Sequence, residues 1–407
     1  MAIELSTITF TNQDDIFPLS GVERILNTGV ANTLAGNDTI IGTGDRYKSL
    51  YPEGVGILNS GTLNTAEGND LITGMGSVYG IENSGTLNTA EGNDTITGIW
   101  GFHGIENYGT LNTGEGNDII TAEGSIYGIY HDGTLNTGEG NDIITADGGA
   151  YGLYNGSFDF NTGDGNDTIN GSGDIFDINN NGFINTGDGD DILTGSGGIA
   201  NEGIINTGNG EDSITQGWFS NYGGVFLGDG NDSIIVNIDT TYIRYLALEN
   251  SNAIETGEGD DIITSTGVIY NNGGVINTGN GNDSIIVDVP GTGYDIYNDG
   301  GINTGNGNDS IIAKGGFESG LNNSGSVFLG DGEDYLNSFG GGDFYGGNDE
   351  DTLELTSGTY TVGIWGTSAI FTKGNQLMIT SEFEKLKAGS IIYDFTNLTA
   401  GQIIIVA

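Results

Sequence analysis

Apolar residues recur along this chain in short runs that repeat about every two dozen residues, in three columns. The first column is apolar in every copy and contains Leu63, Leu87, Leu111, Leu135, Phe160, Ile184, Ile205, Val225, Ile254, Ile276, Ile302 and Val327. The second contains Ile72, Ile96, Ile120, Ile144, Ile169, Leu193, Ile214, Ile234, Ile263, Ile285, Ile311 and Leu336. The third runs through Ile81, Ile105, Ile129 and Leu153. Each position lies in a few residues rich in Ile, Thr, Val and Tyr and bounded by Gly, Asn and Asp, which indicates strands.

A six-residue polar loop of the form TGEGND separates the first two columns. Its copies end at twelve aspartates spaced 20 to 29 residues apart: Asp70, Asp94, Asp118, Asp142, Asp167, Asp191, Asp212, Asp232, Asp261, Asp283, Asp309 and Asp334. Degraded copies end at Asp38 and Asp351. A fixed period of this length is typical of a solenoid, in which each unit buries its apolar face against its neighbours.

The sequence therefore predicts an all-β fold, a right-handed parallel β-helix or β-roll with about 24 residues per coil, one loop edge and a cap at each end. We expect an N-terminal capping region at residues 1–48, where Ile3, Leu5, Ile8 and Phe10 alternate with other residues as in an edge or capping strand. The solenoid should span residues 49–351, with an insertion at Ile238 to Leu248. Residues 352–407 leave the period and form a separate β-rich segment.

Two further columns repeat in register with the apolar ones. Asn64, Asn88, Asn112, Asn136, Asn161, Asn185 and Asn206 predict an amide ladder that satisfies the turn backbone. Tyr79, Tyr127 and Tyr151 share an aromatic slot with His103, and His131 takes a slot filled elsewhere by Asn. For both histidines, a ladder position is favoured over catalysis.

The charge of the chain limits which kinds of partner it can bind. The formal net charge is −48, and a compact array of this charge repels itself unless cations bind. Between Ser49 and Thr372 the only cationic side chains are Arg244 and Lys314, so nucleic acid is not an expected partner. The absence of cysteine excludes disulfides. No stretch is long and apolar enough to span a membrane, and the N-terminus lacks the features of a secretory signal.

The loop chemistry favours calcium. This ion takes six to eight oxygen ligands from carboxylates and backbone carbonyls, and a G-x-G-x-D loop offers both. Stacked loops would place about one ion in each gap between adjacent coils, which couples folding to binding. A single Gly-Asn-Asp run would be explained as a good turn, but twelve copies with the aspartate fixed in one slot favour a metal site.

The loops TGEGND and TGDGND, with an aliphatic residue two positions after the aspartate, resemble the hemolysin-type calcium-binding repeats of RTX (repeats-in-toxin) proteins, whose pattern GGxGxDxUx builds calcium-binding β-rolls. The resemblance covers about residues 34–351 and implies that the loop aspartates and neighbouring loop carbonyls bind calcium. The glycines assigned to the site are Gly114, Gly116, Gly138, Gly140, Gly163, Gly165, Gly187 and Gly189. Here Thr usually replaces the first glycine, and one motif per coil predicts one line of ions. Ala66, Ala90 and Asp349 replace loop glycines in three copies.

The C-terminal segment, with GTYTVG, TKGNQLMITSEFEKLKAG and YDFTNLTAGQIIIVA, is similar to the ends of RTX proteins exported by type I secretion, cyanobacterial ones in particular. Such signals are C-terminal and are not cleaved. The resemblance implies a secreted, extracellular or cell-surface protein that folds when it meets calcium outside the cell.

Three classes of function remain open at this point. The first is a calcium-stiffened structural protein of a surface layer, sheath, extracellular matrix or filament, with homo-oligomers formed end to end or by strand pairing. The second is a calcium-dependent adhesin, with surface glycans as partners, or an ice-binding module; Glu67, Glu91 and Glu115 in the third loop slot disfavour ice. The third is a polysaccharide-acting enzyme, which we do not expect because HExxH and GxSxG motifs are absent.

Overall fold

The computed structural model describes residues 2–18, 23–47, 51–238, 246–289, 293–319 and 325–407. Residues 239–245 of the expected insertion, and the expected boundary at residues 48 and 49, lie outside this set. The fold prediction is confirmed, because the described residues form an all-β parallel solenoid of about 13 turns with about 24 residues per turn. The chain divides into two compact units, Met1–Asn209 (unit 1) and Gly210–Ala407 (unit 2).

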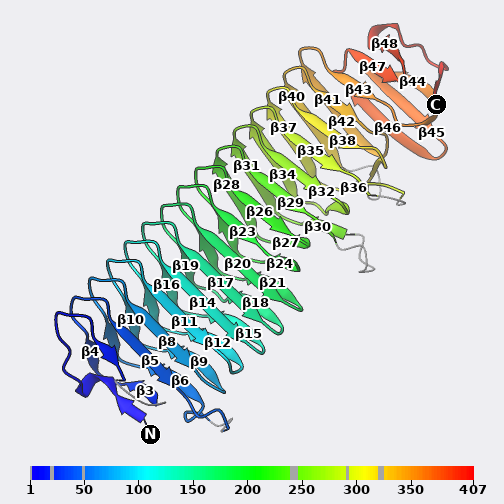
Figure 1. Cartoon of the computed structure of the whole chain (residues 1–407). Coiled ribbons are helices and arrows are strands. Elements are labelled where there is room, and N and C mark those ends of the chain that lie inside the picture. Colours follow the sequence, from blue (N-terminus) through cyan, green and yellow to red (C-terminus); the bar gives the residue numbers. More distant parts are fainter. Residues whose placement is uncertain (1, 19–22, 48–50, 239–245, 290–292, 320–324) are drawn as a thin grey trace. The chain divides into compact units, whose positions relative to one another are not determined.

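Unit 1 contains three parallel sheets, and each turn contributes one strand to each sheet (Figure 1). Sheet A of unit 1 consists of β1 (Ala2–Glu4), β3 (Arg24–Asn27), β6 (Val55–Asn59), β9 (Tyr79–Asn83), β12 (His103–Asn107), β15 (Tyr127–His131), β18 (Tyr151–Asn155), β21 (Phe176–Asn180) and β24 (Gly198–Asn201). Sheet B consists of β2 (Ile16–Phe17), β5 (Thr39–Thr43), β8 (Leu71–Met75), β11 (Thr95–Ile99), β14 (Ile119–Gly124), β17 (Ile143–Gly148), β20 (Thr168–Gly173) and β23 (Ile192–Thr194). Sheet C consists of β4 (Val30–Asn32), β7 (Thr62–Asn64), β10 (Thr86–Asn88), β13 (Thr110–Asn112), β16 (Thr134–Asn136), β19 (Asp159–Asn161), β22 (Phe183–Asn185) and β25 (Ile204–Asn206).

Unit 2 repeats this arrangement and ends in antiparallel strands. Its sheet A consists of β27 (Trp218–Asn221), β30 (Leu246–Asn250), β33 (Val268–Asn271), β36 (Ile296–Asn298) and β39 (Phe317–Glu318). Its sheet B consists of β26 (Ser213–Gln216), β29 (Ser233–Val236), β32 (Ile262–Ser265), β35 (Ser284–Val287), β38 (Ser310–Ala313), β41 (Tyr335–Asn337), β43 (Thr352–Glu354), β47 (Lys385–Ala388) and β48 (Ile391–Asp394). Its sheet C consists of β28 (Gly224–Asp229), β31 (Ala253–Glu258), β34 (Val275–Asn280), β37 (Gly301–Asn306), β40 (Ser326–Asp331), β42 (Gly342–Asn348), β46 (Gln376–Ser381), β45 (Ser368–Lys373), β44 (Gly358–Trp365) and β49 (Ile403–Val406).

The three predicted apolar columns form the interior of the turns. Leu111 on sheet C, Ile120 on sheet B and Ile105 on sheet A are fully buried, and every other predicted column residue is buried as well. Strands pair in register, so that Ile96 lies opposite Ile120 and Leu87 opposite Leu111. Because parallel strands stack identical side chains one coil apart, the repeat in the sequence becomes a continuous core.

Close packing between sheets A and B explains one class of glycine. A Cβ added at Gly98 on β11 would lie 2.3 Å from the carbonyl oxygen of Gly104 on β12. Asp177 occupies the slot of Gly104 on β21, and its carboxylate accepts hydrogen bonds from the N–H groups of Gly173 and Gly197. The coil that ends at Asp212 is shorter than 24 residues, and its Gly195 lies against this carboxylate, since an added Cβ would be 2.1 Å from Asp177 Oδ2.

The two predicted ladders are also present, although the bonds of the first join side chains, while backbone carbonyls accept from the sheet A ladder of Asn59, Asn83 and Asn107. Asn88 Nδ2 donates to Asn64 Oδ1 at 2.6 Å, and the same bond recurs along sheet C of unit 1. The Tyr79 and His103 rings lie 5.0 Å apart and the Tyr127 and Tyr151 rings 4.9 Å apart. His131 is fully buried within a second amide ladder on sheet A, and burial lowers its pKa to about 4, so its ring is neutral.

The N-terminal segment differs from its prediction. The alternation from Ile3 to Phe10 does not form one strand, because β1 ends at Glu4 and a 3₁₀ helix, η1 (Leu5–Thr7), follows. Leu5 and Phe10 are nonetheless buried. A second 3₁₀ helix, η2 (Phe395–Asn397), lies near the C-terminus. No helix in the described part of the chain is long and apolar enough to cross a membrane.

Candidate metal-binding site

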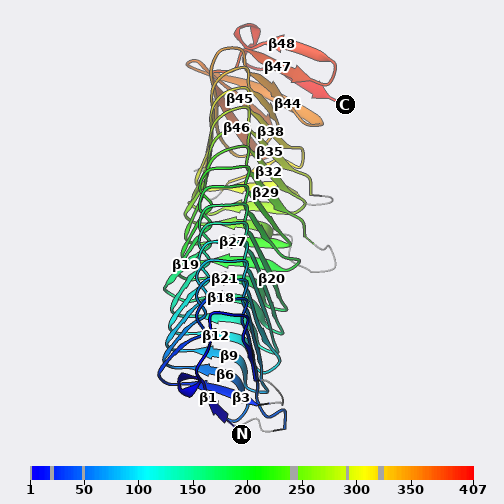
Figure 2. The ribbon, with the colours of Figure 1, turned by 60° about the vertical axis from the view of Figure 1, so that its left-hand side comes forward.

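The polar loops join each strand of sheet C to the next strand of sheet B, and in each unit they stack in line (Figure 2). Four hydrogen bonds tie a typical loop to the next. Thr113 Oγ1 donates to the Thr137 carbonyl at 3.1 Å, and the Gly116 N–H donates to the Glu139 carbonyl at 2.8 Å. The Asn141 N–H donates to Asn117 Oδ1 at 2.8 Å. The fourth bond joins the aspartates.

The loop aspartates form what we call the aspartate ladder. The backbone N–H of Asp118 donates to Oδ1 of Asp142, one coil further on, at 2.7 Å. In unit 1 the same bond links Asp15, Asp38, Asp70, Asp94, Asp118, Asp142, Asp167 and Asp191 in succession. In unit 2 it links Asp212, Asp232, Asp261, Asp283, Asp309, Asp334 and Asp351. All twelve predicted aspartates thus belong to these two runs.

These carboxylates are buried rather than displayed on the loop surface. Asp118 is 1% exposed, and no other predicted loop aspartate exceeds 2%. The acids in the third loop slot are solvated instead: Glu91, Glu115 and Glu139 line an open groove on the outside of the loops. The loops that contain Glu91, Glu115 and Glu139 therefore carry one buried carboxylate and one solvated carboxylate each.

In eleven of the ladder aspartates the second carboxylate oxygen lacks a hydrogen-bond partner. Oδ2 is buried without a hydrogen bond in Asp38, Asp70, Asp94, Asp118, Asp142, Asp167, Asp232, Asp283, Asp309, Asp334 and Asp351. Asp261 differs, because its Oδ2 accepts from Thr256 Oγ1 at 2.5 Å. A buried charged oxygen without a hydrogen-bond partner costs about 2 kcal/mol or more. The repetition of this arrangement over many coils favours a bound cation or a proton on these carboxylates.

Burial raises the pKa of the ladder aspartates. It raises the pKa of Asp118 to about 7, against a lowering by the neighbouring Thr113 hydroxyl and the Asp94 N–H. The pKa rises to about 7 in Asp70, Asp309 and Asp351, to about 6 in Asp142, Asp167, Asp261 and Asp334, and to about 8 in Asp232. Two unit charges about 4.8 Å apart repel by about 3 kcal/mol at an effective dielectric constant of 20. The ladder therefore favours protons or cations.

The predicted glycines shape the backbone beside the ladder. Gly114 and Gly116 have φ of 103° and 146°, and the other six assigned glycines have φ between 96° and 145°. A Cβ at Gly140 would lie 1.8 Å from the Gly116 carbonyl oxygen, so these carbonyls point along the stack at the next glycine. Ala66, Ala90 and Asp349 keep the positive φ of the glycines they replace, at 64°, 72° and 83°.

The Asp carboxylates of the ladder suit a hard cation such as calcium only together with backbone carbonyl oxygens of the loops. No group of three or more His, Cys, Asp or Glu side chains that could hold a metal occurs in the part of the chain that the structure describes. Carboxylates alone therefore do not form a cage. One orphaned Asp oxygen per coil, combined with peptide carbonyls of the same loops, is the oxygen-only chemistry that calcium accepts.

No protein-family model and no curated protein matches the chain. The assignment of the site therefore depends on its geometry and on the resemblance of its loops.

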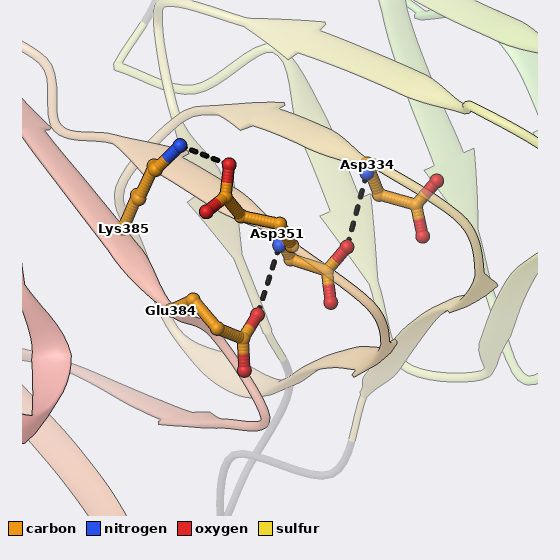
Figure 3. A network of polar contacts seen from close by, with 5 residues as sticks. Asp334, Asp351, Glu384 and Lys385 are labelled. Atoms are coloured by element: carbon orange, nitrogen blue, oxygen red, sulfur yellow. Dashed lines mark hydrogen bonds and ion pairs between the residues drawn. The ribbon is translucent and has the colours of Figure 1, made fainter.

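The sequence identified Asp351 as the end of a degraded loop copy but did not indicate the residue that follows it in the ladder. Asp351, whose loop has Asp349 in place of a glycine, is fully buried and accepts the Asp334 N–H at 3.0 Å. Its own N–H donates at 2.9 Å to Oε2 of Glu384, which follows β46, so a glutamate from the C-terminal segment takes the place of the next aspartate (Figure 3). Beside it, Lys385 forms an ion pair with Glu350. The GGNDED copy indicates Asp351, whereas no spacing in the sequence indicates Glu384.

Proposed function

We propose that this protein is a secreted calcium-binding structural protein whose solenoid is stiffened by cations held along the aspartate ladder. The observation that carries the proposal is the run of buried Oδ2 atoms without partners in consecutive coils, such as those of Asp94, Asp118 and Asp142. A bound calcium ion would neutralise these carboxylates and complete their coordination, which hydrogen bonds within the protein do not do.

The residues of each loop have separate parts in this proposal. Asp118 Oδ1 accepts the Asp94 N–H and fixes the carboxylate, which leaves Oδ2 as the ligand. The Gly114 and Gly116 backbone supplies carbonyl oxygens. The stacking of coils brings the oxygens of two loops together, so the complete donor set exists only in the folded array.

Export and assembly remain part of the proposal rather than of the structure. The similarity of the C-terminal segment to type I export signals supports an extracellular or cell-surface location, where calcium is plentiful. A chain that is almost entirely repeat supports a structural role in a layer, sheath or filament, without a catalytic role.

The test is circular dichroism with light scattering on chelator-treated protein, titrated with calcium and, separately, with magnesium. We expect a cooperative rise in β signal that calcium produces at much lower concentration than magnesium, because magnesium loses its water reluctantly. A β signal that is unchanged by chelator, or equal for both ions, contradicts the proposal.

A calcium-dependent binder of an ordered surface is the second candidate, and one observation favours it. The outward positions of β8, β11, β14 and β17 form three rows, of which two are uncharged: Thr73, Thr97, Thr121 and Thr145 in one, and Leu71, Thr95, Ile119 and Ile143 in the other. The third row contains Met75, Ile99, Glu123 and Asp147 and is acidic at one end. A flat face of hydroxyl and methyl groups suits ice or a neutral glycan better than the acidic loops do. Thermal hysteresis in calcium supports the ice-binding form, and its absence excludes that form.

A further inference from the structure

Two glutamates occupy neighbouring positions on the outer side of sheet A in unit 1. Register pairs Glu82 of β9 with Glu106 of β12, and Leu58 and Tyr130 precede and follow them in the same row. Because adjacent parallel strands are about 4.8 Å apart, the two carboxyl groups are stacked one coil apart. The loops of the aspartate ladder join sheet C to sheet B, so this pair on sheet A is a separate cluster of acids.

The two carboxyl groups are shielded from solvent. Glu106 is 4% exposed, and Glu82 Oε2 is buried without a hydrogen-bond partner. The Tyr51 hydroxyl, in the turn before β6, donates to Glu82 Oε1 at 3.3 Å. The Tyr108 hydroxyl, in the turn after β12, donates to Glu106 Oε1 at 3.0 Å. Each glutamate thus has one oxygen held by a phenol, while the second oxygen of Glu82 is left without a partner.

The pair lacks cations that would balance two negative charges. In the described part of the chain, His103 is the basic group that contacts the pair, with its Nδ1 at 3.3 Å from Glu106 Oε1. Even a charged His103 balances only one of the two carboxylates. Arg24 acts on Tyr51 instead, where its charge opposes the rise in the pKa of the phenol.

The remaining groups around the pair supply no counter-charge either. They are phenols whose pKa is raised by burial, so they stay neutral: Tyr51, Tyr79, Tyr108 and Tyr130. Among the residues that the structure describes, no three or more His, Cys, Asp or Glu side chains form a group that could hold a metal. The side chains of Glu82, Glu106 and His103 therefore do not form a metal cage.

A single proton resolves both problems of this pair. Two like charges one coil apart in a shielded site repel each other, and the repulsion disfavours ionisation of both groups. A proton on Glu82 Oε2 removes one charge and converts the unpaired oxygen into a donor for the Glu106 carboxylate. In agreement, burial raises the pKa of Glu82 to about 7; the charge of Glu106 adds to the rise, and the Tyr51 hydroxyl opposes it.

We propose that Glu82 and Glu106 share one proton at neutral pH and thereby form a pH-sensitive hydrogen bond between the coils of β9 and β12. Release of the proton to water at higher pH leaves two adjacent charges and weakens the contact between these coils. The pKa of Glu82 in the folded chain lies above the value of about 4.3 in an unfolded chain. The stabilisation is therefore complete below about pH 4 and is lost as pH rises through about 7. This inference goes beyond the proposed function and does not depend on cations bound at the ladder.

The direct test is carbon-13 NMR of the full chain labelled at the glutamate carboxyl carbon, titrated from about pH 4 to about pH 9 while circular dichroism shows the native β signal. This label keeps the ladder aspartates out of the spectrum. One glutamate resonance should have its midpoint near 7, and it should be absent in Glu82→Gln. Glu106→Gln should lower the midpoint, because it removes the neighbouring charge.

Thermal melting tests whether the proton stabilises the fold. Between about pH 5 and about pH 8 the melting temperature of the wild type should fall relative to that of Glu82→Gln, because the glutamine amide donates to Glu106 at every pH. The aspartate ladder is the same in both chains, so its own pH dependence cancels in this comparison. Glu115→Gln removes the same charge from a solvated position and should follow the wild type in parallel.

The proposal fails if every glutamate carboxyl group titrates below about pH 5.5. It also fails if the melting difference between wild type and Glu82→Gln is constant with pH, or if Glu115→Gln reproduces it. A midpoint near 7 that drops below about pH 5.5 when calcium is added would mean that a metal cation, and not a proton, occupies the pair.

Discussion

The backbone N–H of Asp118 donates to Oδ1 of Asp142 at 2.7 Å and leaves Asp142 Oδ2 buried without a partner. In Asp94, Asp118 and Asp142, one carboxylate oxygen thus accepts a hydrogen bond that joins two coils, while the other oxygen has no partner. This division explains why a polar side chain is fixed in a buried slot of every coil, because its hydrogen bond holds the coils together and its orphaned oxygen requires a cation or a proton.

Replacing Asp118 with Asn should have opposite effects with and without calcium. The Asn side chain retains the acceptor for the Asp94 N–H but removes the buried charge. Without cations the variant should therefore be more stable, with a rise in melting temperature of about 2 to 4 °C for each kcal/mol gained. In calcium it should be less stable and bind about one or two fewer ions, by isothermal titration calorimetry.

The matched control for Asp118→Asn is Glu115→Gln, which neutralises the solvated acid of the same loop. It should change neither the number of ions bound nor the melting temperature by more than a small amount. Equal behaviour of the two variants would place the cations on the outer groove and not on the ladder.

Without cations, stability should fall as pH rises. The pKa values of the ladder aspartates are raised from about 3.9 in the unfolded chain to about 6 to 8 in the folded one. Between these limits the folded chain binds more protons than the unfolded chain, so the free energy of unfolding decreases from about pH 4 to about pH 8. Chelator-treated protein should melt at a higher temperature at pH 5 than at pH 8, and calcium should reverse the order. A melting temperature that rises from pH 5 to pH 8 in chelator is the contradictory result.

Gly116 should tolerate no side chain. A Cβ there would lie 1.7 Å from the Gly92 carbonyl oxygen, and φ is 146°. Gly116→Ala should cost more than about 2 kcal/mol by urea unfolding, since backbone must move. Gly273 provides the control: its φ is 76° but no atom lies within 4 Å of an added Cβ, so Gly273→Ala should cost only about 1 kcal/mol. Equal costs would mean that conformational strain, and not the approach of the coils, determines the glycine.

Glu384 should contribute more to the stability of unit 2 than the neighbouring ion pair of Lys385 and Glu350 does. Glu384→Ala leaves the N–H of the buried Asp351 without its acceptor and should destabilise unit 2 by about 1 to 3 kcal/mol. Lys385→Gln removes the exposed ion pair with Glu350 and should cost less than about 1 kcal/mol. Hydrogen exchange of the Asp351 amide is the specific measurement, and unchanged protection in Glu384→Ala would contradict the assigned contact.

The sequence predicted the core of this protein well for a physical reason. In a parallel solenoid each interior position recurs one coil later, so Leu111 and Ile120 are identified by their repeated neighbours. The same logic predicted the amide ladder at Asn64 and the aspartate column. It could not determine whether the loop aspartates point outward or inward, because both directions satisfy the same spacing.

Other features depend on contacts that break the repeat. Asp351 belongs to the ladder because Asp349 adopts a positive φ without being glycine, and Glu384 reaches it from the non-repeating segment. Asp177 occupies a glycine slot, and its carboxylate accepts hydrogen bonds from the Gly173 and Gly197 N–H groups. The repeat indicates Asp351, but the roles of Glu384 and Asp177 follow from neither period nor composition, so only the three-dimensional arrangement reveals them.

The most direct test is a crystal structure of calcium-loaded protein with anomalous scattering measured at a wavelength that identifies calcium. We predict anomalous peaks beside Oδ2 of Asp94, Asp118 and Asp142, one for each gap between adjacent coils. Peaks only beside the outer acids, such as Glu115 and Glu139, or no peak within ligand distance of any ladder carboxylate, would contradict the assignment of the ladder as the calcium site.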